Sequence, residues 1–309
     1  MIDQQTRFAA ANGAPSAATV FGAAADETPA WLSQLRIALT YGARHRRLVR
    51  CHRPRRFTEW IQWRKLHDRD ERMPPLVDKL AVKDHVAAEL GAEWVTPTLF
   101  EGPALPEQPL WEPAFVVKSR HGCNQSAFVR TGAEDWAAIR AAAARWVRQP
   151  YGEWLDEWLY RHVPRGVMVE PFIGGGGALP VDYKIFVFGG RAAFVKVDRD
   201  RERAHRLAYY DLNWRRVWAP KGWQDPPPPQ SLREMIAAAE HLGRGFDFVR
   251  ADFYDVGGRP RFGELTFYPG SGLNPLPRML DYQLGALWAE ARDRRLAGHQ
   301  TACGQSGCM

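Results

Sequence analysis

The sequence predicts a mixed α+β fold in which most strands are antiparallel. Apolar residues recur at helical spacing in several segments of the chain. Between these segments lie pairs of apolar strands joined by short polar or glycine-rich loops, at 114–130, 181–199 and 249–267. The 309 residues are 45% hydrophobic and 25% charged, which is typical of a soluble globular chain with one to three domains.

The first region of the chain, residues 31–110, is predicted to be mainly helical. Apolar spacing indicates three helices, over 31–50, 57–66 and 78–91. The third helix begins near Asp78, and Gly91 is its stop signal. We expect a strand at 94–99, followed by a proline-rich connection.

The second region, residues 111–180, is predicted to form one subdomain. It opens with a strand, a polar loop and a second strand, and then has a strong helical pattern at 133–148. A further helical stretch is expected around 151–160. The apolar run at 166–173 indicates a buried strand, which leads into a glycine-rich loop.

The third region, residues 181–296, is predicted to form a second subdomain. It contains two paired strands, a helix at 231–246, a hairpin, and a final helix over about 280–296. Residues 1–30 and 297–309 are rich in small and polar side chains, and we expect both tails to be disordered.

The net charge of +7 leaves several classes of partner open, including nucleic acid, an anionic membrane surface and a phosphorylated ligand. Basic residues concentrate at 44–65 and 199–206. The first cluster interleaves Trp60 and Trp63 with arginines, which suits a nucleic-acid patch or an amphipathic helix with core aromatics. No nucleic-acid-binding motif accompanies it, so we expect core aromatics and no nucleic-acid partner.

The lack of a recognisable targeting signal and the spacing of the cysteines lead us to expect a cytoplasmic setting. No apolar run approaches the ~18 residues of a membrane helix, which leaves only peripheral membrane association open. The N-terminus lacks the basic and apolar regions of a secretory signal. Cysteine spacing suits neither a zinc site nor a disulfide framework, and a reducing compartment fits better; the four are Cys51, Cys123, Cys303 and Cys308.

The register of the last strand pair decides which side chains face each other. A regular pair with a two-residue loop would set Glu264 among apolar neighbours. A three-residue loop, Gly257–Arg259, moves the register by one residue, so that Asp252 faces Glu264 and Arg250 faces Thr266. The opposite face then becomes a continuous core stripe of Val249, Ala251, Phe253, Leu265 and Phe267.

The apolar pattern therefore predicts two carboxylates directly opposite each other, an arrangement that destabilises a sheet unless a cation neutralises it. A divalent metal bound by Asp252 and Glu264 is one interpretation. The other is a solvent-exposed face on which the acids pair with Arg250 and neighbouring basic residues. The hairpin alone leaves both open.

Other polar groups on strand ends could bind a nucleotide. Lys118 closes an apolar strand, and the polar loop 121–126 after it could hold a phosphate on backbone N–H groups, although a surface hairpin is the alternative. Glu170 ends a buried strand whose exit could offer backbone groups to a purine edge. Lys184 lies within a strand, on the same side as Asp182.

Taken in chain order, these groups resemble the inventory of the ATP-grasp superfamily. Arg250-Ala251-Asp252 matches an Arg-x-Asp motif of ligases related to D-alanine–D-alanine ligase, and Glu264-Leu265-Thr266 matches their Glu-x-Asn except for its threonine. A Pro-Gly loop follows at Pro269-Gly270. Over about residues 55–285 the chain resembles the TupA-like ATP-grasp family of polysaccharide biosynthesis, through segments at 57–86, 170–173, 182–191, 209–214 and 250–272.

The resemblance implies an ATP-grasp fold, with two α+β subdomains that clasp ATP and a helical N-terminal pre-domain. It implies that Lys79 and Lys118 contact the ATP phosphates and that Lys184 reaches the nucleotide. The stretch from Glu170 to Ile173 would hold the adenine. The loop over the phosphates would supply His121, Gly122 and Ser126.

The same resemblance assigns the metal and catalytic groups. Asp252 and Glu264 would bind Mg²⁺, together with Thr266, whose hydroxyl is a weaker ligand than the asparagine carbonyl of the family. One Mg²⁺ ion or two are both compatible with that replacement. Arg250 and Arg199 would be catalytic, stabilising charge on the transferred phosphoryl group or on an anionic intermediate.

The implied activity is that of an ATP-dependent carboxylate–amine ligase, which forms an acyl phosphate and then an amide. Its substrates would be a small-molecule or glycan-linked carboxylate and an amine, on a sugar acid or on a cell-envelope or capsule precursor. A phosphotransferase acting on a hydroxyl group is an alternative. So is an ATP-binding protein without turnover, which the departure at Thr266 favours. The oligomeric state cannot be predicted from these features.

Overall fold

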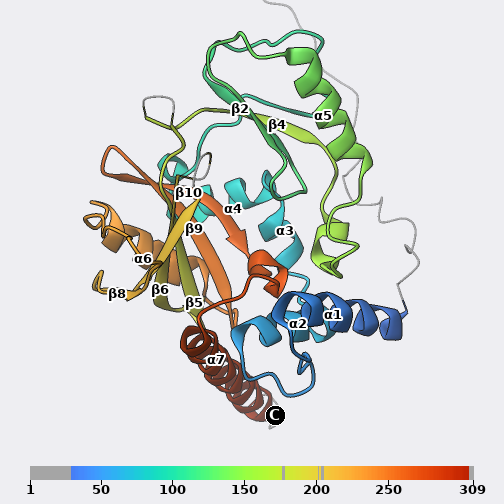
Figure 1. The fold of residues 1–309 in the computed structure, drawn as a ribbon, viewed down its shortest axis with the longest axis vertical. Coiled ribbons are helices and arrows are strands. Elements are labelled where there is room, and N and C mark those ends of the chain that lie inside the picture. Colours follow the sequence, from blue (N-terminus) through green and yellow to red (C-terminus); the bar gives the residue numbers. More distant parts are fainter. Residues whose placement is uncertain (1–28, 176–177, 201, 203–204, 306–309) are drawn as a thin grey trace, which may run out of the picture.

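Two antiparallel sheets form the framework of the protein (Figure 1). The computed structural model describes residues 29–175, 178–200, 202 and 205–305. One sheet has four strands in the order β1-β4-β2-β3, and the other has six strands in the order β10-β9-β5-β6-β7-β8. The class predicted from sequence, α+β with mostly antiparallel strands, is confirmed.

The four-stranded sheet carries helix α5 (Trp136–Arg148) on one face. Its strands are β1 (Phe100–Gly102), β2 (Phe115–Ser119), β3 (Ser126–Val129) and β4 (Val167–Pro171). The side chain of Asp135 caps α5 by accepting a hydrogen bond from the Ala138 amide at 3.0 Å. Ile139 and Ala143 of the helix join Phe115, Val117 and Val169 in a separate small core.

The six-stranded sheet lies in the larger core, with α6 (Leu232–Leu242) packed on it. Its strands are β5 (Asp182–Phe188), β6 (Arg191–Arg199), β7 (Arg206–Tyr210), β8 (Arg216–Trp218), β9 (Val249–Val256) and β10 (Arg259–Thr266). Met235 and Ala239 of α6 are fully buried in this core. The strands β7 and β8 were not predicted from the sequence.

Three of the four N-terminal helices, the second to the fourth, contribute buried residues to the same large core, and the first lies against the second. The four are α1 (Ala30–His45), α2 (Phe57–His67), α3 (Met73–Val77) and α4 (Ala81–Leu90), and α2 lies against the last helix, α7 (Arg278–Gln305). The ring of Trp60 stacks on Trp288 with centroids 5.8 Å apart. Trp60 is therefore a core residue, as the amphipathic-helix interpretation of the basic segment predicts.

Several element boundaries differ from those predicted. The expected strand at 94–99 is wrong: a short 3-10 helix (Ala92–Trp94) comes first, and strand β1 begins only at Phe100. The expected helix around 151–160 is reduced to a 3-10 helix at Trp158–His162. The last helix continues to Gln305, because a single glycine at position 298 does not stop it, so the tail predicted from 297 is helical over its first part.

Two further points concern the N-terminal tail and membrane-spanning helices. The predicted disordered tail at 1–30 falls almost entirely outside the described residues. Among the helices that are described, none is both long enough and apolar enough to cross a bilayer.

Two helix glycines should respond in opposite ways to alanine. A Cβ atom on Gly285 of α7 would lie 2.4 Å from the Arg55 carbonyl oxygen, whereas one on Gly42 of α1 would meet nothing closer than 3.8 Å. We expect Gly285→Ala to lower the free energy of unfolding by about 1–3 kcal/mol through overpacking. Gly42→Ala should raise it by roughly 0.5–1 kcal/mol. Urea unfolding of both variants checks this, and equal effects would contradict it.

Candidate active site

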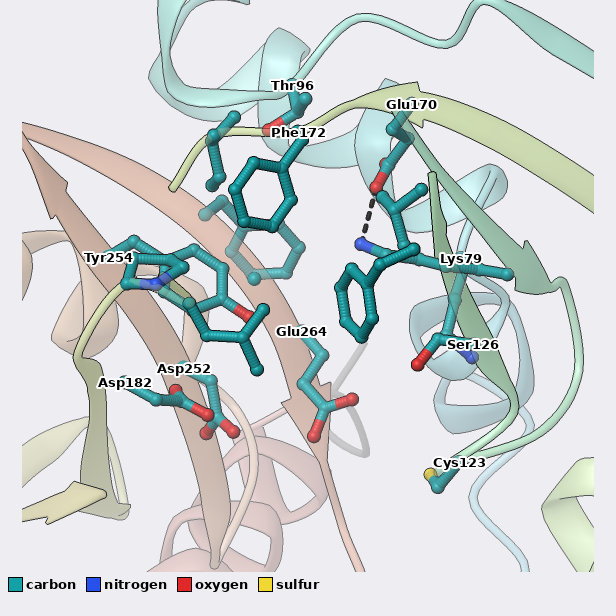
Figure 2. Close-up of a pocket in the computed structure, with 18 of the residues that line it drawn as sticks. Lys79, Thr96, Cys123, Ser126, Glu170, Phe172, Asp182, Asp252, Tyr254 and Glu264 are labelled. Atoms are coloured by element: carbon teal, nitrogen blue, oxygen red, sulfur yellow. Dashed lines mark hydrogen bonds and ion pairs between the residues drawn. The ribbon is translucent and has the colours of Figure 1, made fainter. Parts of the chain in front are cut away.

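A cavity of about 260 Å³ lies between the two sheets (Figure 2). The four-stranded sheet and its loops line one side, and the six-stranded sheet lines the other. Nine residues predicted to bind the nucleotide or metal line this cavity: Lys79, Lys118, Gly122, Ser126, Glu170, Ile173, Lys184, Asp252 and Glu264. Groups that lie more than 180 residues apart in the sequence thus meet at one place.

Two lysines share one buried carboxylate on the side of the four-stranded sheet. Glu170 Oε1 accepts from Lys83 Nζ at 2.6 Å, and Glu170 Oε2 accepts from Lys118 Nζ at 2.5 Å. Burial by itself would raise the pKa of Glu170, but the two ammonium groups outweigh it, so that the pKa is lowered. Lys118 is 31% exposed and is available to an anion in the cavity.

The part of the cavity beyond Glu170 is mainly apolar. Phe128 and Phe172 meet edge to face with their ring centroids 5.9 Å apart. Ile173 and Tyr254 line the same cavity, and Figure 2 shows Phe172 and Tyr254 on the side away from Cys123. A flat aromatic ligand would find apolar contacts here, next to charged groups for its polar end.

The hairpin of β9 and β10 does set the two acids face to face, as predicted, but by a different route. Asp252 pairs with Glu264, and Arg250 pairs with Thr266. The expected three-residue loop is wrong, because Val256 pairs with Arg259 across a two-residue turn. The register shifts instead at a β-bulge between Phe262 and Glu264.

Gly263 is the extra residue of this bulge. A Cβ atom there would lie 3.1 Å from the carbonyl oxygen of Asp252 and 3.3 Å from the ring of Tyr254. Glycine therefore lets the bulged strand approach its partner closely. Because of the bulge, the hairpin can have a two-residue glycine turn and still place the core stripe in the register expected from a three-residue loop.

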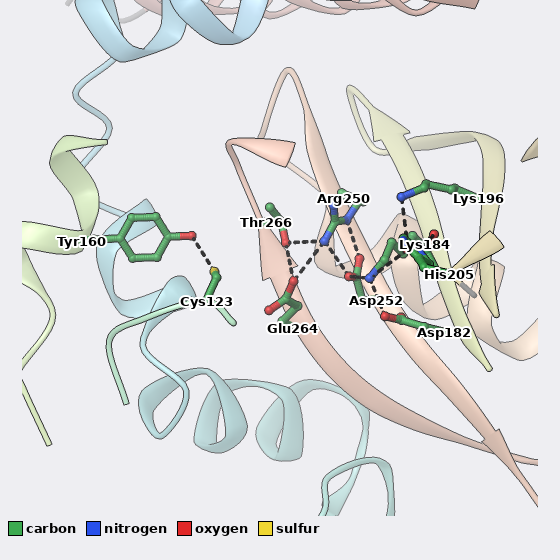
Figure 3. A network of polar contacts seen from close by, with 11 residues as sticks. Cys123, Tyr160, Asp182, Lys184, Lys196, His205, Arg250, Asp252, Glu264 and Thr266 are labelled. Carbon is green, nitrogen blue, oxygen red and sulfur yellow. Dashed lines mark hydrogen bonds and ion pairs between the residues drawn. The ribbon is translucent and has the colours of Figure 1, made fainter. Parts of the chain in front are cut away.

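Basic side chains, rather than solvent, neutralise the paired acids (Figure 3). The Nε atom of Arg250 lies 2.6 Å from Asp252 Oδ1, and its Nη2 atom lies 3.0 Å from Glu264 Oε1. Lys184 Nζ lies 2.6 Å from Asp252 Oδ2 and also bonds Asp182. Burial would raise the pKa of Asp252, but Arg250 and Lys184 outweigh it and the pKa is lowered.

Asp252 and Glu264 have the donor chemistry for Mg²⁺, which takes oxygen ligands from one or two carboxylates together with phosphates. Glu264 is 36% exposed at the cavity, and Asp252 lines the cavity beneath it. Among the described residues, no three or more His, Cys, Asp or Glu side chains form a complete metal site. The pair therefore fits an ion whose remaining ligands come from a bound phosphate or water.

Besides Arg250, three residues predicted for the site do not line this cavity. His121 is buried, and its Nε2 atom lies 3.1 Å from the Trp146 carbonyl oxygen of α5, because its loop folds against that helix. The guanidinium of Arg199 lies over the ring of Trp223 at 5.8 Å. Thr266 donates to Glu264 Oε1 at 3.0 Å, so it orients a proposed metal ligand instead of facing the cavity itself.

Some residues of the site were missed in the sequence. Lys83 follows Lys79 by four residues, which is one helical turn, and this spacing could have indicated a second lysine on the same side. Asp182 was placed beside Lys184 but was given no role. The aromatic lining by Phe128 and Tyr254 has no local signal, because it depends on how the two sheets face each other.

A second cavity, of about 640 Å³, lies on the other side of Arg250. Its walls are mainly apolar and aromatic, with a basic group formed by Lys196, His205 and Arg250. Lys196 Nζ lies 3.1 Å from Asp198 Oδ2, and His205 Nε2 lies 3.0 Å from Asp198 Oδ1. Arg250 lines this cavity and also contacts the paired acids of the first one, Asp252 and Glu264.

A buried lysine holds the loop that borders the second cavity. Lys65 of α2 donates to the hydroxyl and the carbonyl oxygen of Ser271, at 2.6 and 3.0 Å. Ser271 has a positive φ of 56°, and Gln62 also donates to its carbonyl oxygen at 2.8 Å. Two side chains of α2 thus hold this loop in a conformation that a serine rarely adopts.

This lysine makes the stability of the protein depend on pH. Burial lowers the pKa of Lys65 to about 8. Between pH 8 and about 10.5 the unfolded chain binds more protons, so the stability of the wild type should rise with pH relative to Lys65→Met. Urea unfolding across this window tests the slope, with the exposed Lys221→Met as control. A flat difference for Lys65→Met would contradict it.

Structure comparison finds ATP-grasp enzymes with low similarity. A D-alanine–D-alanine ligase from Bacillus anthracis shares 15% identity, with a TM-score of 0.43 over 75% of this chain and 69% of that chain. Its complex with ATP gives a TM-score of 0.41 at 15% identity, over 73% and 67% of the two chains. The N5-carboxyaminoimidazole ribonucleotide synthetase of Thermus thermophilus gives 16% identity and a TM-score of 0.39, over 68% and 51%.

Sequence comparison is decisive for the family. No curated protein matches the chain significantly. A family model for the TupA-like ATP-grasp proteins, however, matches residues 59–289, which include both sheets, the first cavity and the paired acids. The ATP-grasp fold expected from the sequence agrees with the two sheets described above. The chain therefore belongs to the TupA-like ATP-grasp family.

Proposed function

We propose that the protein is an ATP-dependent carboxylate–amine ligase that works with ATP and Mg²⁺. The observation that carries this proposal is the paired Asp252 and Glu264 on one wall of the first cavity, facing Lys118 on the other wall. A cavity with lysines opposite two carboxylates suits a nucleotide whose phosphates bring a metal ion with them. Membership of the ATP-grasp family supports ATP as that nucleotide.

The nucleotide would lie along the first cavity. Phe172 and Ile173 offer apolar contacts for the adenine, close to the end of β4. Lys79 and Lys118 would contact the phosphates, under the loop that contains Gly122. A Cβ atom on Gly122 would lie 2.1 Å from Gln125 and 2.9 Å from Ser119 Oγ, so the loop has no room for a side chain at this position. Such a compact loop suits the binding of phosphate by backbone N–H groups.

Asp252 and Glu264 would hold Mg²⁺, which when bound neutralises charge on the β and γ phosphates. Arg250 and Lys184, which contact these acids, would also stabilise negative charge on the transferred phosphoryl group. A carboxylate oxygen of the first substrate attacks the γ phosphorus, and the bond to ADP breaks. An amine then attacks the acyl carbon, and the bond from that carbon to the phosphate oxygen breaks. The nitrogen loses a proton, so that the products are an amide and free phosphate.

The second cavity is our candidate for the carboxylate substrate. Its basic group of Arg250, Lys196 and His205 is suited to an anion, and Arg250 separates it from the first cavity. A carboxylate there would lie next to the place where the γ phosphate would be transferred. A sugar acid or a cell-envelope or capsule precursor, free or glycan-linked, is the class of substrate we propose, in a cytoplasmic setting.

The decisive experiment is an assay of the purified chain with ATP, Mg²⁺ and a panel of uronic acids and amino acids. Products are identified by mass spectrometry while phosphate release is measured in the same samples. Glu264→Gln is the negative variant, and Glu234→Gln, an exposed acid on α6, is its matched control.

Each outcome has a distinct meaning. An amide with equal amounts of ADP and phosphate, lost only in Glu264→Gln, would support the ligase. A phosphorylated acceptor without free phosphate would replace it by a phosphotransferase. Binding of Mg-ATP without turnover by the whole panel would favour a nucleotide-binding protein that lacks this activity.

A further inference from the structure

The outer face of helix α1 is unusually apolar for a helix on the surface of a protein. Trp31, Leu35 and Leu39 are spaced by one helical turn and are 66%, 46% and 64% exposed. The opposite face buries Ile37 and Tyr41 against the protein. A helix that is apolar on both faces normally lies inside a structure, whereas α1 lies at the edge of this one (Figure 1).

The segment that follows α1 is strongly basic. Residues 29–58 contain eight arginines and two histidines but no aspartate or glutamate. Arg36, Arg47 and Arg56 form ion pairs with Asp156 or Asp281. The other five are exposed, and none forms an ion pair with a described residue: Arg44, Arg46, Arg50, Arg53 and Arg55. Leu48, which lies among them, is 87% exposed.

The combination of an apolar stripe with unpaired arginines restricts the partner. A second copy of the chain would set one arginine cluster against the other, and like charges repel. Nucleic acid would satisfy the arginines, but it does not bury a stripe of leucines. An anionic bilayer surface accepts both, since leucine and tryptophan enter the interface while arginines stay at the headgroups.

We propose that α1 and the following segment, Arg46–Arg56, dock the protein on an anionic membrane surface. The docking would be peripheral, with α1 lying in the plane of the interface. It would also place the second cavity close to the membrane. His45 Nε2 lies 2.9 Å from the Gly272 carbonyl oxygen, and Arg44 Nε donates to the Leu273 carbonyl oxygen at 3.2 Å, next to Asn274 in the cavity wall.

Vesicle co-sedimentation tests the docking without any assay of activity. The full chain is mixed with vesicles of phosphatidylcholine alone, or of equal parts phosphatidylcholine and phosphatidylglycerol. One variant removes the stripe, Leu35→Gln/Leu39→Gln, and another removes charge, Arg46→Gln/Arg50→Gln/Arg53→Gln. Controls remove equally exposed groups elsewhere, through Leu110→Gln/Met279→Gln and Arg191→Gln/Arg233→Gln/Arg259→Gln.

We expect the wild type to bind the anionic vesicles and to release them as salt rises. Each α1 variant should bind about tenfold more weakly or worse, while each control stays within about twofold of the wild type. No binding by the wild type at low salt, or equal binding by all variants, overturns the proposal. Light scattering that shows a dimer lost only in Leu35→Gln/Leu39→Gln, or tighter binding to RNA than to vesicles, would also overturn it.

Discussion

Glu264→Gln is expected to lower turnover about a hundredfold or more while the protein stays folded. Glutamine keeps the size of the side chain and an oxygen that can accept from Arg250 and Thr266, but it loses the negative charge. Removal of one group that stabilises charge in a transition state commonly costs a factor of about 10²–10³. Arg250 keeps its bonds to Asp252, at 2.6 Å, so the substitution leaves no buried cation unpaired.

The dependence on Mg²⁺ makes this prediction specific. If Glu264 binds the ion, the Mg²⁺ concentration for half-maximal activity should rise in Glu264→Gln and stay unchanged in Glu234→Gln. Steady-state rates over a range of Mg²⁺ concentrations, with thermal unfolding as the check on folding, provide the measurement. An unchanged rate with unchanged Mg²⁺ dependence would exclude Glu264 as a metal ligand.

The largest effect on stability is expected at Arg64, which has no exposed surface. Its Nε atom lies 3.1 Å from Asp68 Oδ2, its Nη1 atom donates to the Phe248 carbonyl oxygen at 2.9 Å, and its Nη2 atom bonds Asp247. The guanidinium also stacks on Trp288, 4.4 Å from the ring centroid. Arg64→Leu would leave two buried carboxylates without their main partner.

Breaking a buried ion pair on one side commonly costs about 3–5 kcal/mol. We expect a loss of that size in the free energy of unfolding, and a fall in Tm of roughly ten degrees. Adding Asp247→Asn should recover part of the loss, because it removes one of the stranded charges. Arg294→Leu, at a surface pair with Glu290, is the control and should stay within about 0.5 kcal/mol. A loss below about 1 kcal/mol for Arg64→Leu would show that the network contributes little.

The sequence predicted those parts of the site that have a local pattern. The alternation of apolar residues in 249–267 fixed the face of Asp252 and Glu264, although the predicted loop was wrong. The same alternation placed Lys184 beside Asp182, and the structure joins them. In each case a period of two along a strand carries the information.

Other parts depend on contacts that no local pattern encodes. His121 looked like a phosphate-loop residue, but α5 offers its buried ring a carbonyl acceptor, that of Trp146, 25 residues away in the sequence. Arg199 was predicted to be catalytic, but it lines neither cavity, and its guanidinium lies over an aromatic ring, Trp223, that the sequence pattern did not indicate. The second cavity brings α2, β6, β7 and the loop after Pro269 together, and only the assembled fold shows this.

The bulge at Gly263 has a consequence for the order of folding. A chain that zips up from the Gly257-Gly258 turn reaches Gly263 by local steps, in a register that would carry Glu264 toward the apolar face. The shifted register gains free energy only when Leu265 is buried in the core, and that core also requires β5 and α6 to be in place. We therefore expect the two acids to be brought together by late, long-range assembly, so that an early hairpin would not contain the proposed metal site.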